Sequence, residues 1–515
     1  MNTRFLIAGA SIALTAATML AACGGGSGSS GGMSASPSMA GASGVITGFG
    51  SVFVDGREFA TDMHTQVLDG DNDDAPSTTS NLQVGMTVDV DAAGSSATML
   101  RFISAVRGEV DAVDSSGMMT LTVLGQTVQV TGGTSFAGNA GNASAGSAVK
   151  QLSDIHVGDY VVVFGYLECS TSNCSSGATD IVATLVVEPA SIGKYRVQGY
   201  VNNGSSGGFT INGLTVNITA STMCNTMNCA FTNGDFVSVR SSMAPTGTYA
   251  ATGSTLTLAA DDVKLRSMAP TFAVGSTVTI EGPVTQLAGT MFVVRAISVD
   301  ASASGLSSTV AGLADNQMVE VTGTISSSGT LVATSIVVEQ SATFLLMGPL
   351  DSVSSSGLTV LGQSFSVTGE TRFADWATDV RPFNSTNFAT VLAAGDQLVV
   401  SGYPGTGGNV ATRVERIQKP ASPAAAVAGI VSADNPSMDT LTEAGITVTL
   451  SPTTVLFYPG GGNMPTLTGF FGAITPNTTF VGVYGTPGLP AGSSAITAAD
   501  AFMLRLDARW MKSTR

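Results

Sequence analysis

An acidic loop contains the densest group of residues that could bind a metal ion. It reads Asp-Gly-Asp-Asn-Asp-Asp and places Asp69, Asp71 and Asp73 at alternate positions. Alternating carboxylates are typical of the start of a calcium-binding loop, because Ca²⁺ prefers oxygen ligands. An EF-hand, however, requires Gly at the sixth position and Glu at the twelfth, where this chain has Asp74 and Ser80. We therefore favour a solvated surface loop between two strands, with partial calcium binding as the alternative.

Histidine-based catalysis has little support. The chain contains two histidines, His64 beside Asp62 and His156 shortly before Asp159. Nothing resembling a nucleophile elbow surrounds the abundant serines, and a catalytic triad is recognised by geometry rather than by inventory. We interpret both histidines as surface or turn residues. The sequence predicts no catalytic residue and no cofactor, so we do not expect an enzyme.

Four of the five cysteines form two local pairs in polar loops. They are Cys169 with Cys174, and Cys224 with Cys229. In an oxidising compartment such pairs are expected to close disulfides that staple loop tips, and a four-thiolate zinc site is the alternative. No C-x-x-C-H motif occurs, which excludes covalent haem attachment.

The fifth cysteine, Cys23, ends an export signal. Arg4 is followed by a short apolar stretch and then by Leu-Ala-Ala-Cys. This resembles the lipobox of bacterial lipoproteins, which implies that residues 1–22 are a signal peptide and that Cys23 is lipidated. An ordinary signal peptide with an incidental cysteine is the alternative.

A Gly/Ser-rich stretch follows, and we assign residues 23–43 to the lipidated cysteine and a flexible tether. Gly24 stands where Asp commonly signals inner-membrane retention in such lipoproteins, so its presence favours the outer membrane. We expect an exported, lipid-anchored protein that faces either the periplasm or the cell surface.

Composition narrows the possible partners. Charged residues make up 11% of the 515 residues, and the net charge is −16. An acidic chain with no basic run is not suited to binding nucleic acid. Aromatic platforms often bind carbohydrate, and Trp376, in a long loop, is a candidate. A Trp that plugs the mouth of a barrel is the favoured alternative.

The body of the chain is built from repeats. A strand containing Gly between apolar residues recurs, with its glycine at Gly48, Gly108, Gly199, Gly282, Gly348 and Gly429. Five of these openers, all except the one at Gly282, are followed by a short hairpin with Gly at the turn, and the VLGQ version occurs at 123 and 360. Short alternating strands then complete each unit.

These patterns predict an all-β chain: a tandem array of small five-stranded barrels with one core per repeat, arranged as beads on a string. The expected boundaries are 44–105, 106–190, 195–268, 271–341 (irregular), 344–419 and 426–511 (divergent).

The opener at 44–59 and the strand at 82–90 resemble the repeat of the bacterial domain-of-unknown-function family 5666 (DUF5666). The resemblance implies envelope lipoproteins or secreted proteins whose domain is a small barrel similar to the OB-fold. It implies no chemistry, since the family has no established activity.

We therefore expect a non-catalytic binding or structural protein of the cell envelope that holds a polysaccharide, matrix material or a partner protein. Repeated units whose sequences have drifted apart suit multivalent binding better than they suit a single active site. An accessory to an enzyme acting on envelope polymers, or a periplasmic assembly factor, is the alternative.

Overall fold

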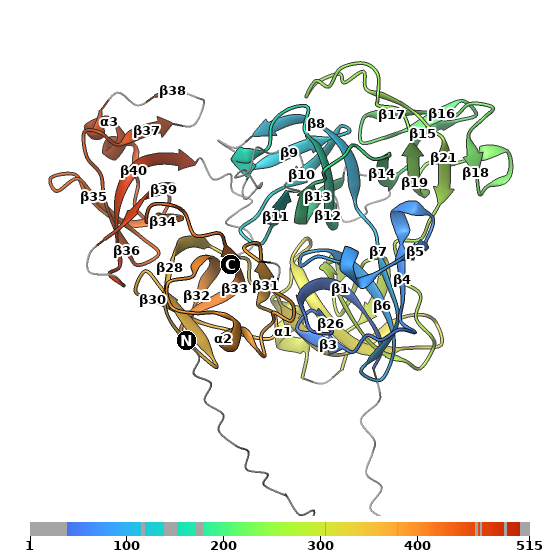
Figure 1. Ribbon diagram of the computed structural model, residues 1–515. Helices are drawn as coiled ribbons and strands as arrows, with labels where there is room; N and C mark the ends of the chain where they lie inside the picture. Colours follow the sequence, from blue (N-terminus) through green and yellow to red (C-terminus); the bar gives the residue numbers. More distant parts are fainter. Residues whose placement is uncertain are drawn as a thin grey trace, which may run out of the picture. The chain divides into compact units, whose positions relative to one another are not determined.

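The computed structural model describes residues 39–504, except for residues 115–118, 139–151, 170–178, 304, 379, 459–461, 464–465 and 489–491. Within this part of the chain the fold is mostly β, as the alternating patterns predict (Figure 1). The α-helices described there are short: α1 (Ser307–Ala311), α2 (Phe388–Val391) and α3 (Leu467–Ala473). None of the helices in these residues is long and apolar enough to cross a membrane.

The second repeat shows the common unit most clearly, because its strands pair into a ring. Its strands are β8 (Val106–Asp114), β9 (Thr120–Val123), β10 (Gln126–Gln129), β11 (Ser135–Gly138), β12 (Tyr160–Cys169) and β13 (Thr179–Glu188). β8 pairs with β9, β9 with β10, β10 in parallel with β13, β13 with β12, and β12 again with β8. The five strands of this ring form a closed barrel, which confirms the expectation of a small OB-like barrel.

The fifth repeat forms a second closed barrel with the same order of strands. It comprises β28 (Phe344–Ser354), β29 (Gly357–Val360), β30 (Gln363–Ser366), β31 (Arg372–Asp375), β32 (Gln397–Gly405) and β33 (Gly408–Ile417). The sixth repeat pairs its strands in this order too, β34–β35–β36–β40–β39 and back to β34. Its strands are β34 (Ala425–Asn435), β35 (Thr440–Glu443), β36 (Ile446–Thr449), β37 (Val455–Tyr458), β38 (Gly462–Asn463), β39 (Phe480–Pro487) and β40 (Ala495–Leu504).

The other repeats are variants of this unit. Repeat 1 contains β1 (Met39–Phe49), β2 (Val52–Val54), β3 (Arg57–Phe59), β4 (Gln66–Asp69), β5 (Ala75–Ser77), β6 (Thr87–Ala93) and β7 (Ser96–Phe102). Repeat 3 contains β14 (Tyr195–Tyr200), β15 (Asn202–Ser205), β16 (Gly208–Ile211), β17 (Leu214–Asn217), β18 (Met223–Cys224), β19 (Phe236–Ser241), β20 (Thr257–Ala259) and β21 (Asp262–Leu265). Repeat 4 contains β22 (Thr277–Pro283), β23 (Thr285–Ala288), β24 (Met291–Val294), β25 (Ile297–Asp300), β26 (Met318–Ile325) and β27 (Leu331–Val338).

The short hairpin has the same turn in every repeat. Both turn residues have positive φ in Asp55–Gly56, Leu124–Gly125, Asn212–Gly213, Arg295–Ala296, Leu361–Gly362 and Ala444–Gly445. Positive φ at both positions is typical of a type I′ turn, whose twist matches that of the flanking strands. Glycine at the second position favours this turn, since it adopts positive φ without steric cost. The glycine signal therefore predicts five of these six hairpins correctly, and repeat 4 forms the same turn with Arg295–Ala296 although it has no glycine there.

The opener glycine makes room for the first residue of that turn. A Cβ added to Gly108 would lie 2.6 Å from Cγ of Leu124, and one added to Gly348 would lie 2.7 Å from Cγ of Leu361. In repeat 1 the glycine in this position is Gly44, where a Cβ would overlap the carboxylate of Asp55. Gly44, rather than the expected Gly48, is therefore the equivalent of Gly108 and Gly348.

The first strand begins earlier than expected. Residues up to 43 were assigned to the tether, whereas β1 starts at Met39 and pairs with both β6 and β22. Small side chains permit this close approach: Ala42 is buried, and a Cβ on Gly41 would lie 2.4 Å from the carbonyl oxygen of Val90. Because small residues are also typical of linkers, composition led to the wrong boundary.

The repeats associate in pairs through their first strands. β8 of repeat 2 pairs with β14 of repeat 3, β28 of repeat 5 pairs with β34 of repeat 6, and β1 of repeat 1 pairs in parallel with β22 of repeat 4. Each of β1, β8 and β28 pairs with its own hairpin only along its C-terminal half. The N-terminal half would otherwise leave backbone groups unpaired, and the first strand of another repeat satisfies them.

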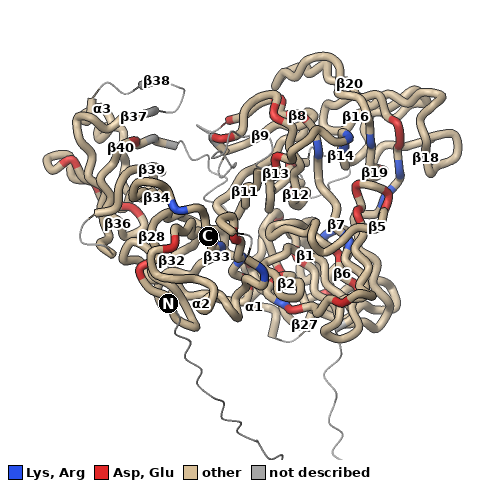
Figure 2. The backbone as a smooth tube through the Cα atoms, viewed as in Figure 1, with Lys and Arg blue, Asp and Glu red and all other residues tan. Residues whose placement is uncertain are grey.

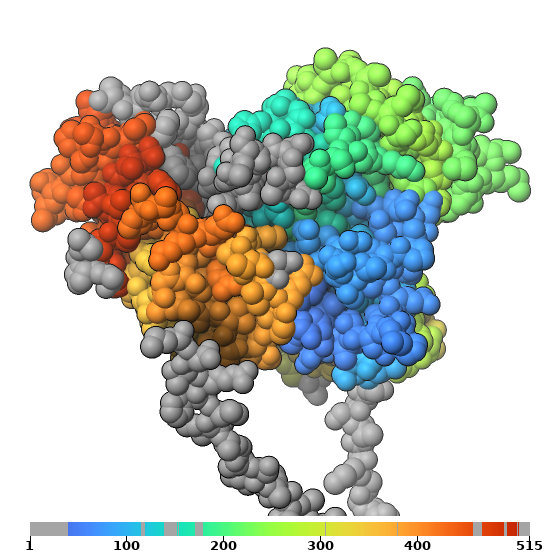
Figure 3. All heavy atoms as spheres, viewed as in Figure 1, coloured from blue at the N-terminus to red at the C-terminus, as the bar shows by residue number. Residues whose placement is uncertain are grey.

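The expectation of beads on a string is consequently wrong. One cluster of buried apolar side chains runs through repeats 1, 2 and 3, another through repeats 5 and 6, and a third lies in repeat 4. The space-filling view shows atoms of repeats 1 and 2, in blue and teal, in direct contact (Figure 3). Barrels of this size bury more apolar surface when they share a core.

Candidate functional site

A cavity of about 390 Å³ lies where repeats 1, 2, 3 and 4 meet. Its walls come from β6 and β7, from β12, from β14, β19 and the chain after β21, and from β22, β23 and β24. Small-molecule sites typically enclose ~300–1,000 Å³. The lining includes an aromatic group, Tyr166, Tyr200, Phe236 and Phe272, and a charged group, Asp74, Asp89, Asp91, Arg101, Arg266 and Arg295.

Three rings of the aromatic group are half-buried, those of Tyr200, Phe236 and Phe272. Tyr200 and Phe236 pack edge to face, with ring centroids 5.2 Å apart, and the Tyr200 hydroxyl contacts Sδ of Met268 at 3.1 Å. Phe272 lies against β1, because Gly41 has no side chain there: a Cβ would be 2.9 Å from Cε1 of the ring. The edge-to-face contact is a geometry that aromatic pairs favour, so it orients the rings.

Most charged side chains of the cavity are held by ion pairs. Arg101 Nε donates to Asp74 Oδ1 at 2.5 Å, and Arg295 Nη1 lies 3.2 Å from Asp89 Oδ1. The guanidinium of Arg295 also lies over the ring of Tyr166, 5.7 Å from its centroid. These contacts fix the charged groups before a ligand arrives, which lowers the entropy cost of binding a ligand between them.

Asp91 is different, because no ion pair or side-chain hydrogen bond of its carboxylate occurs within the described residues. It lies two positions after Asp89 on β6 and is half-buried. Burial, and then the negative charge of Asp89, raise the pKa of the Asp91 carboxyl above its usual value. Its charge is therefore poorly compensated.

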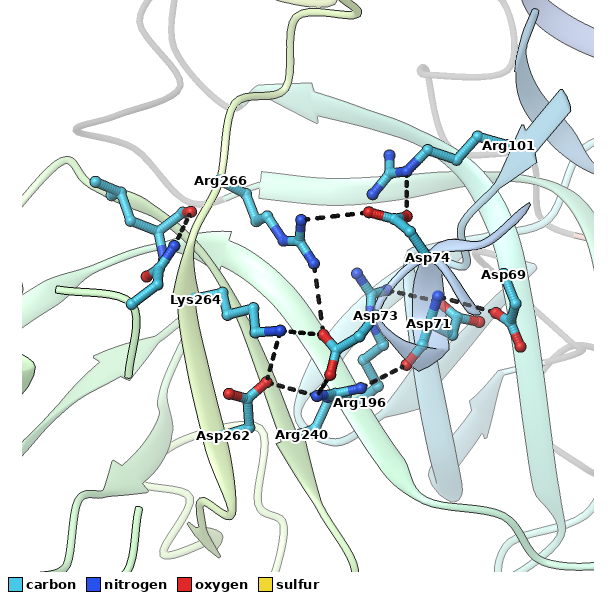
Figure 4. A network of polar contacts seen from close by, with 12 residues as sticks. Asp69, Asp71, Asp73, Asp74, Arg101, Arg196, Arg240, Asp262, Lys264 and Arg266 are labelled. Carbon is cyan, nitrogen blue, oxygen red and sulfur yellow. Dashed lines mark hydrogen bonds and ion pairs between the residues drawn. The ribbon is translucent and has the colours of Figure 1, made fainter. Parts of the chain in front are cut away.

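The acidic loop lies next to the cavity and forms a salt-bridge network (Figure 4). Asp69 caps the short 3₁₀-helix Gly70–Asn72 by accepting the backbone N–H of Asp71 at 3.0 Å. The Asp71 carboxylate is buried, accepts the backbone N–H of Ser104 at 3.0 Å and pairs with Arg196 at 3.1 Å. Burial lowers the pKa of the Arg196 guanidinium to about 10, although Asp71 acts to raise it.

The same loop reaches repeat 3. Asp73 is paired with Arg240 and Lys264, and Arg240 also donates to Asp262 at 2.7 Å. Along the tube, charged residues of both signs gather near β5, β7 and β19, whereas most of the chain carries few (Figure 2). The loop is thus a junction between repeats that is buried at Asp71 and exposed to solvent at Asn72 and Asp73. Within the described residues no group of three or more His, Cys, Asp or Glu could hold a metal ion, so calcium binding remains a prediction without support.

A second acidic junction lies beneath the opener of repeat 1. The backbone N–H of Val45 donates both to Asp55 Oδ1 at 2.8 Å and to Glu281 Oε2 of repeat 4 at 3.0 Å. Both side chains are buried. Burial, followed by the charge of Glu281, raises the pKa of the Asp55 carboxyl well above its usual value, with further contributions from Glu339 and Glu320. The carboxyl of Asp55 therefore favours its protonated form.

The cysteine predictions fall partly within the described residues. Cys224 and Cys229 form a disulfide, which confirms that pair. Cys169 is disulfide-bonded, whereas Cys174 lies outside the described residues, as does the lipidation candidate Cys23.

The other candidates do not come together. The side chains of His64 and His156 are 82% and 75% exposed, each beside one aspartate, Asp62 and Asp159. Trp376 is half-buried and packs against the joint core of repeats 1–3, so it does not form an open platform. His64, His156 and Trp376 therefore do not form a common site in the structure.

The cavity residues were not anticipated. Asp89 and Asp91 alternate with buried Val88 and Val90 on β6, so both carboxylates lie on the polar face of that strand. The sequence feature that could have revealed them is the pair of acidic residues on one face of β6, where the polar faces of the strands mostly carry Thr and Ser. Their aromatic partners come from repeat 3 and from the chain that leads into repeat 4, and no local pattern connects them.

Comparison with protein families agrees with the repeated barrels. The DUF5666 model, a domain of unknown function, matches residues 43–100, 107–172, 198–253, 281–337 and 347–415. The protein belongs to the DUF5666 family. Four of the five DUF5666 segments contribute to the cavity, and the sixth repeat keeps the DUF5666 strand order outside the matched segments. No curated protein matches the chain.

Proposed function

We propose that this protein is a non-catalytic binding protein of the cell envelope and that the inter-repeat cavity holds a segment of polysaccharide. The observation that carries the proposal is the composition of the wall, in which Tyr200, Phe236 and Phe272 line the same space as Gln198 and the charged residues. Sugar rings have apolar faces that pack on aromatic side chains and hydroxyl groups that hydrogen-bond to amide and charged groups.

Binding fits the site better than catalysis. No histidine or cysteine lines the cavity in the part of the chain that the structure describes. Arg101 and Arg295 are engaged with Asp74 and Asp89, which suits fixed recognition of a ligand. Because four repeats build the wall, a ligand would also hold those repeats together.

The envelope location rests on Cys23 and the Gly/Ser-rich stretch after it. Changing Cys23→Ser is expected to abolish incorporation of labelled fatty acid into the protein, since serine has no thiol to form the thioether to the lipid. Protease treatment of intact cells, with released peptides identified by mass spectrometry, distinguishes a surface-facing array from a periplasmic one. Undiminished fatty-acid labelling of the serine variant would contradict lipidation of Cys23.

Polysaccharide binding is tested with the full chain in detergent against a panel of immobilised bacterial polysaccharides. The variant Tyr200→Ala is expected to weaken binding by at least about tenfold, since an aromatic contact contributes on the order of 1 kcal/mol beyond its buried area. Tyr403→Ala is the matched control, because Tyr403 is half-buried in repeat 5 and does not line the cavity. Absence of binding to every polysaccharide, or equal losses in both variants, would refute the proposal.

A further inference from the structure

We infer that the cavity selects polysaccharides that carry free amino groups, so that a protonated amine of the ligand sits against Asp91. This inference rests on the proposed function and specifies its ligand class.

The ion pairs of the cavity wall leave Asp91 without a counter-charge. Asp74 is paired with Arg101, and Asp89 with Arg295. The guanidinium of Arg266 faces the acidic loop, 3.8 Å from Asp73 and 3.9 Å from Asp74. Among the charged wall residues, Asp91 alone lacks an ionic partner within the described residues. A cationic group of the ligand can therefore pair with Asp91, since no arginine of the cavity wall does so.

The sheet around Asp91 does not supply a cation either. Its neighbours across the strands are Gly41 on β1 and Met99 on β7, and neither carries a charge. A half-buried carboxylate without a partner loses part of its hydration without compensation. A cation placed in the cavity restores that compensation.

An aromatic ring lies beside the carboxylate. Phe272 packs on Gly41, the residue paired with Asp91, so the ring and the carboxylate lie against adjacent positions of the sheet. A carboxylate together with aromatic faces is a common way to bind an ammonium group, because the ring quadrupole attracts the cation.

The same geometry disfavours other ligands. An acidic sugar would meet the unpaired Asp91, while Arg101 and Arg295, which could bind its carboxylate, are already paired with Asp74 and Asp89. A divalent metal requires several oxygen ligands, and Asp91 offers one carboxylate. An amino sugar supplies the missing charge together with a ring face for Tyr200 and Phe236.

The test is calorimetry of the full chain with two oligosaccharide probes, a glucosamine tetramer and its N-acetylated counterpart. The free-amine tetramer is expected to bind on the order of tenfold more tightly, in keeping with a charge-assisted contact to Asp91. Asp91→Asn is expected to abolish that preference, so that the two tetramers bind with equal affinity. Asp434→Asn, at a half-buried strand position of repeat 6 outside the cavity, is the charge-matched control.

Equal affinity for the two tetramers, or an unchanged preference in Asp91→Asn, would overturn the inference. If neither tetramer binds but another polysaccharide of the panel does, the inference fails while the proposed function stands. If no polysaccharide binds, both fail. A lysine-containing peptide that binds as tightly as the free-amine tetramer would identify a protein ligand and overturn the sugar assignment. Thermal unfolding of Asp91→Asn close to that of the parent chain shows that any loss is not misfolding.

Discussion

Two acidic junctions between repeats compensate their buried carboxyl groups in different ways. At the acidic loop, the buried carboxylate of Asp71 is compensated by Arg196 of repeat 3, and Asp73 by Arg240 and Lys264. At the opener of repeat 1, Asp55 faces another carboxylate, Glu281, across a single backbone N–H. The first junction compensates its buried carboxylates with cations. At the second, Arg372 lies 3.9 Å from Glu281 Oε1, whereas the Asp55 carboxyl has no ion pair among the described residues and its pKa is raised.

The difference explains why Asp91 stands out. A carboxylate withdrawn from water needs a cation, a proton or hydrogen-bond donors. Asp71 has guanidinium partners, and burial with a neighbouring acid raises the pKa of Asp55 well above its usual value. The pKa of Asp91 is raised as well, but its carboxylate has no partner among the described residues and borders a cavity. We therefore expect a cationic group of the ligand to compensate the charge of Asp91.

The largest expected effect follows from removing the charge of Asp71. Asp71→Asn leaves Arg196, whose side chain is 1% exposed, without its carboxylate. Breaking a buried ion pair from one side costs about 3–5 kcal/mol. Urea unfolding of the full chain measures the loss, and Asp69→Asn, which keeps a capping oxygen, is expected to cost less than about 1 kcal/mol. Equal losses in the two variants would contradict a special role for Asp71.

The stability contributed by the junction at Asp55 is expected to depend on pH. Because the folded pKa of Asp55 is raised, its contribution to stability is fully present below the unfolded pKa and is lost as pH rises through the folded pKa. Asp55→Asn removes this titration, so as pH rises above about 4 its free energy of unfolding should fall less than that of the parent, by about 1.4 kcal/mol for each unit by which the pKa is raised. Parallel pH profiles of the two proteins in urea unfolding would contradict the raised pKa of Asp55.

A smaller loss is expected at Asp73 within the same network as Asp71. Its side chain is 41% exposed, so water screens its pairs with Arg240 and Lys264. Asp73→Asn should lower the free energy of unfolding by about 1 kcal/mol or less. A loss as large as that of Asp71→Asn would show that burial does not separate the two aspartates.

The smallest effect on stability is expected at Asp91. Because its carboxylate has no partner among the described residues, Asp91→Asn should change the free energy of unfolding by less than about 0.5 kcal/mol. Thermal unfolding of the variant checks this. A clear destabilisation would mean that Asp91 stabilises the fold, which would contradict a role confined to ligand binding.

Local features could be predicted from the sequence. The glycines of Asp55–Gly56, Leu124–Gly125 and Leu361–Gly362 mark turns whose conformation depends on adjacent residues, and the structure shows these turns. The Cys224–Cys229 disulfide is local as well. The candidate site could not be predicted from the sequence, because Asp91 and Phe272 are far apart in the chain. They come close only through the β1–β6 pairing and the packing of Phe272 on Gly41.

The sequence by itself determined the barrel repeats of this protein, since alternating strands and tight turns depend on neighbouring residues. Only the tertiary structure decided which repeats pair. β1 joins β22, and Asp71 meets Arg196, because half-paired first strands need partners and buried carboxylates need compensation. Those needs can be met by residues anywhere along the chain. The cavity with its unpaired Asp91 arises from that choice of partners.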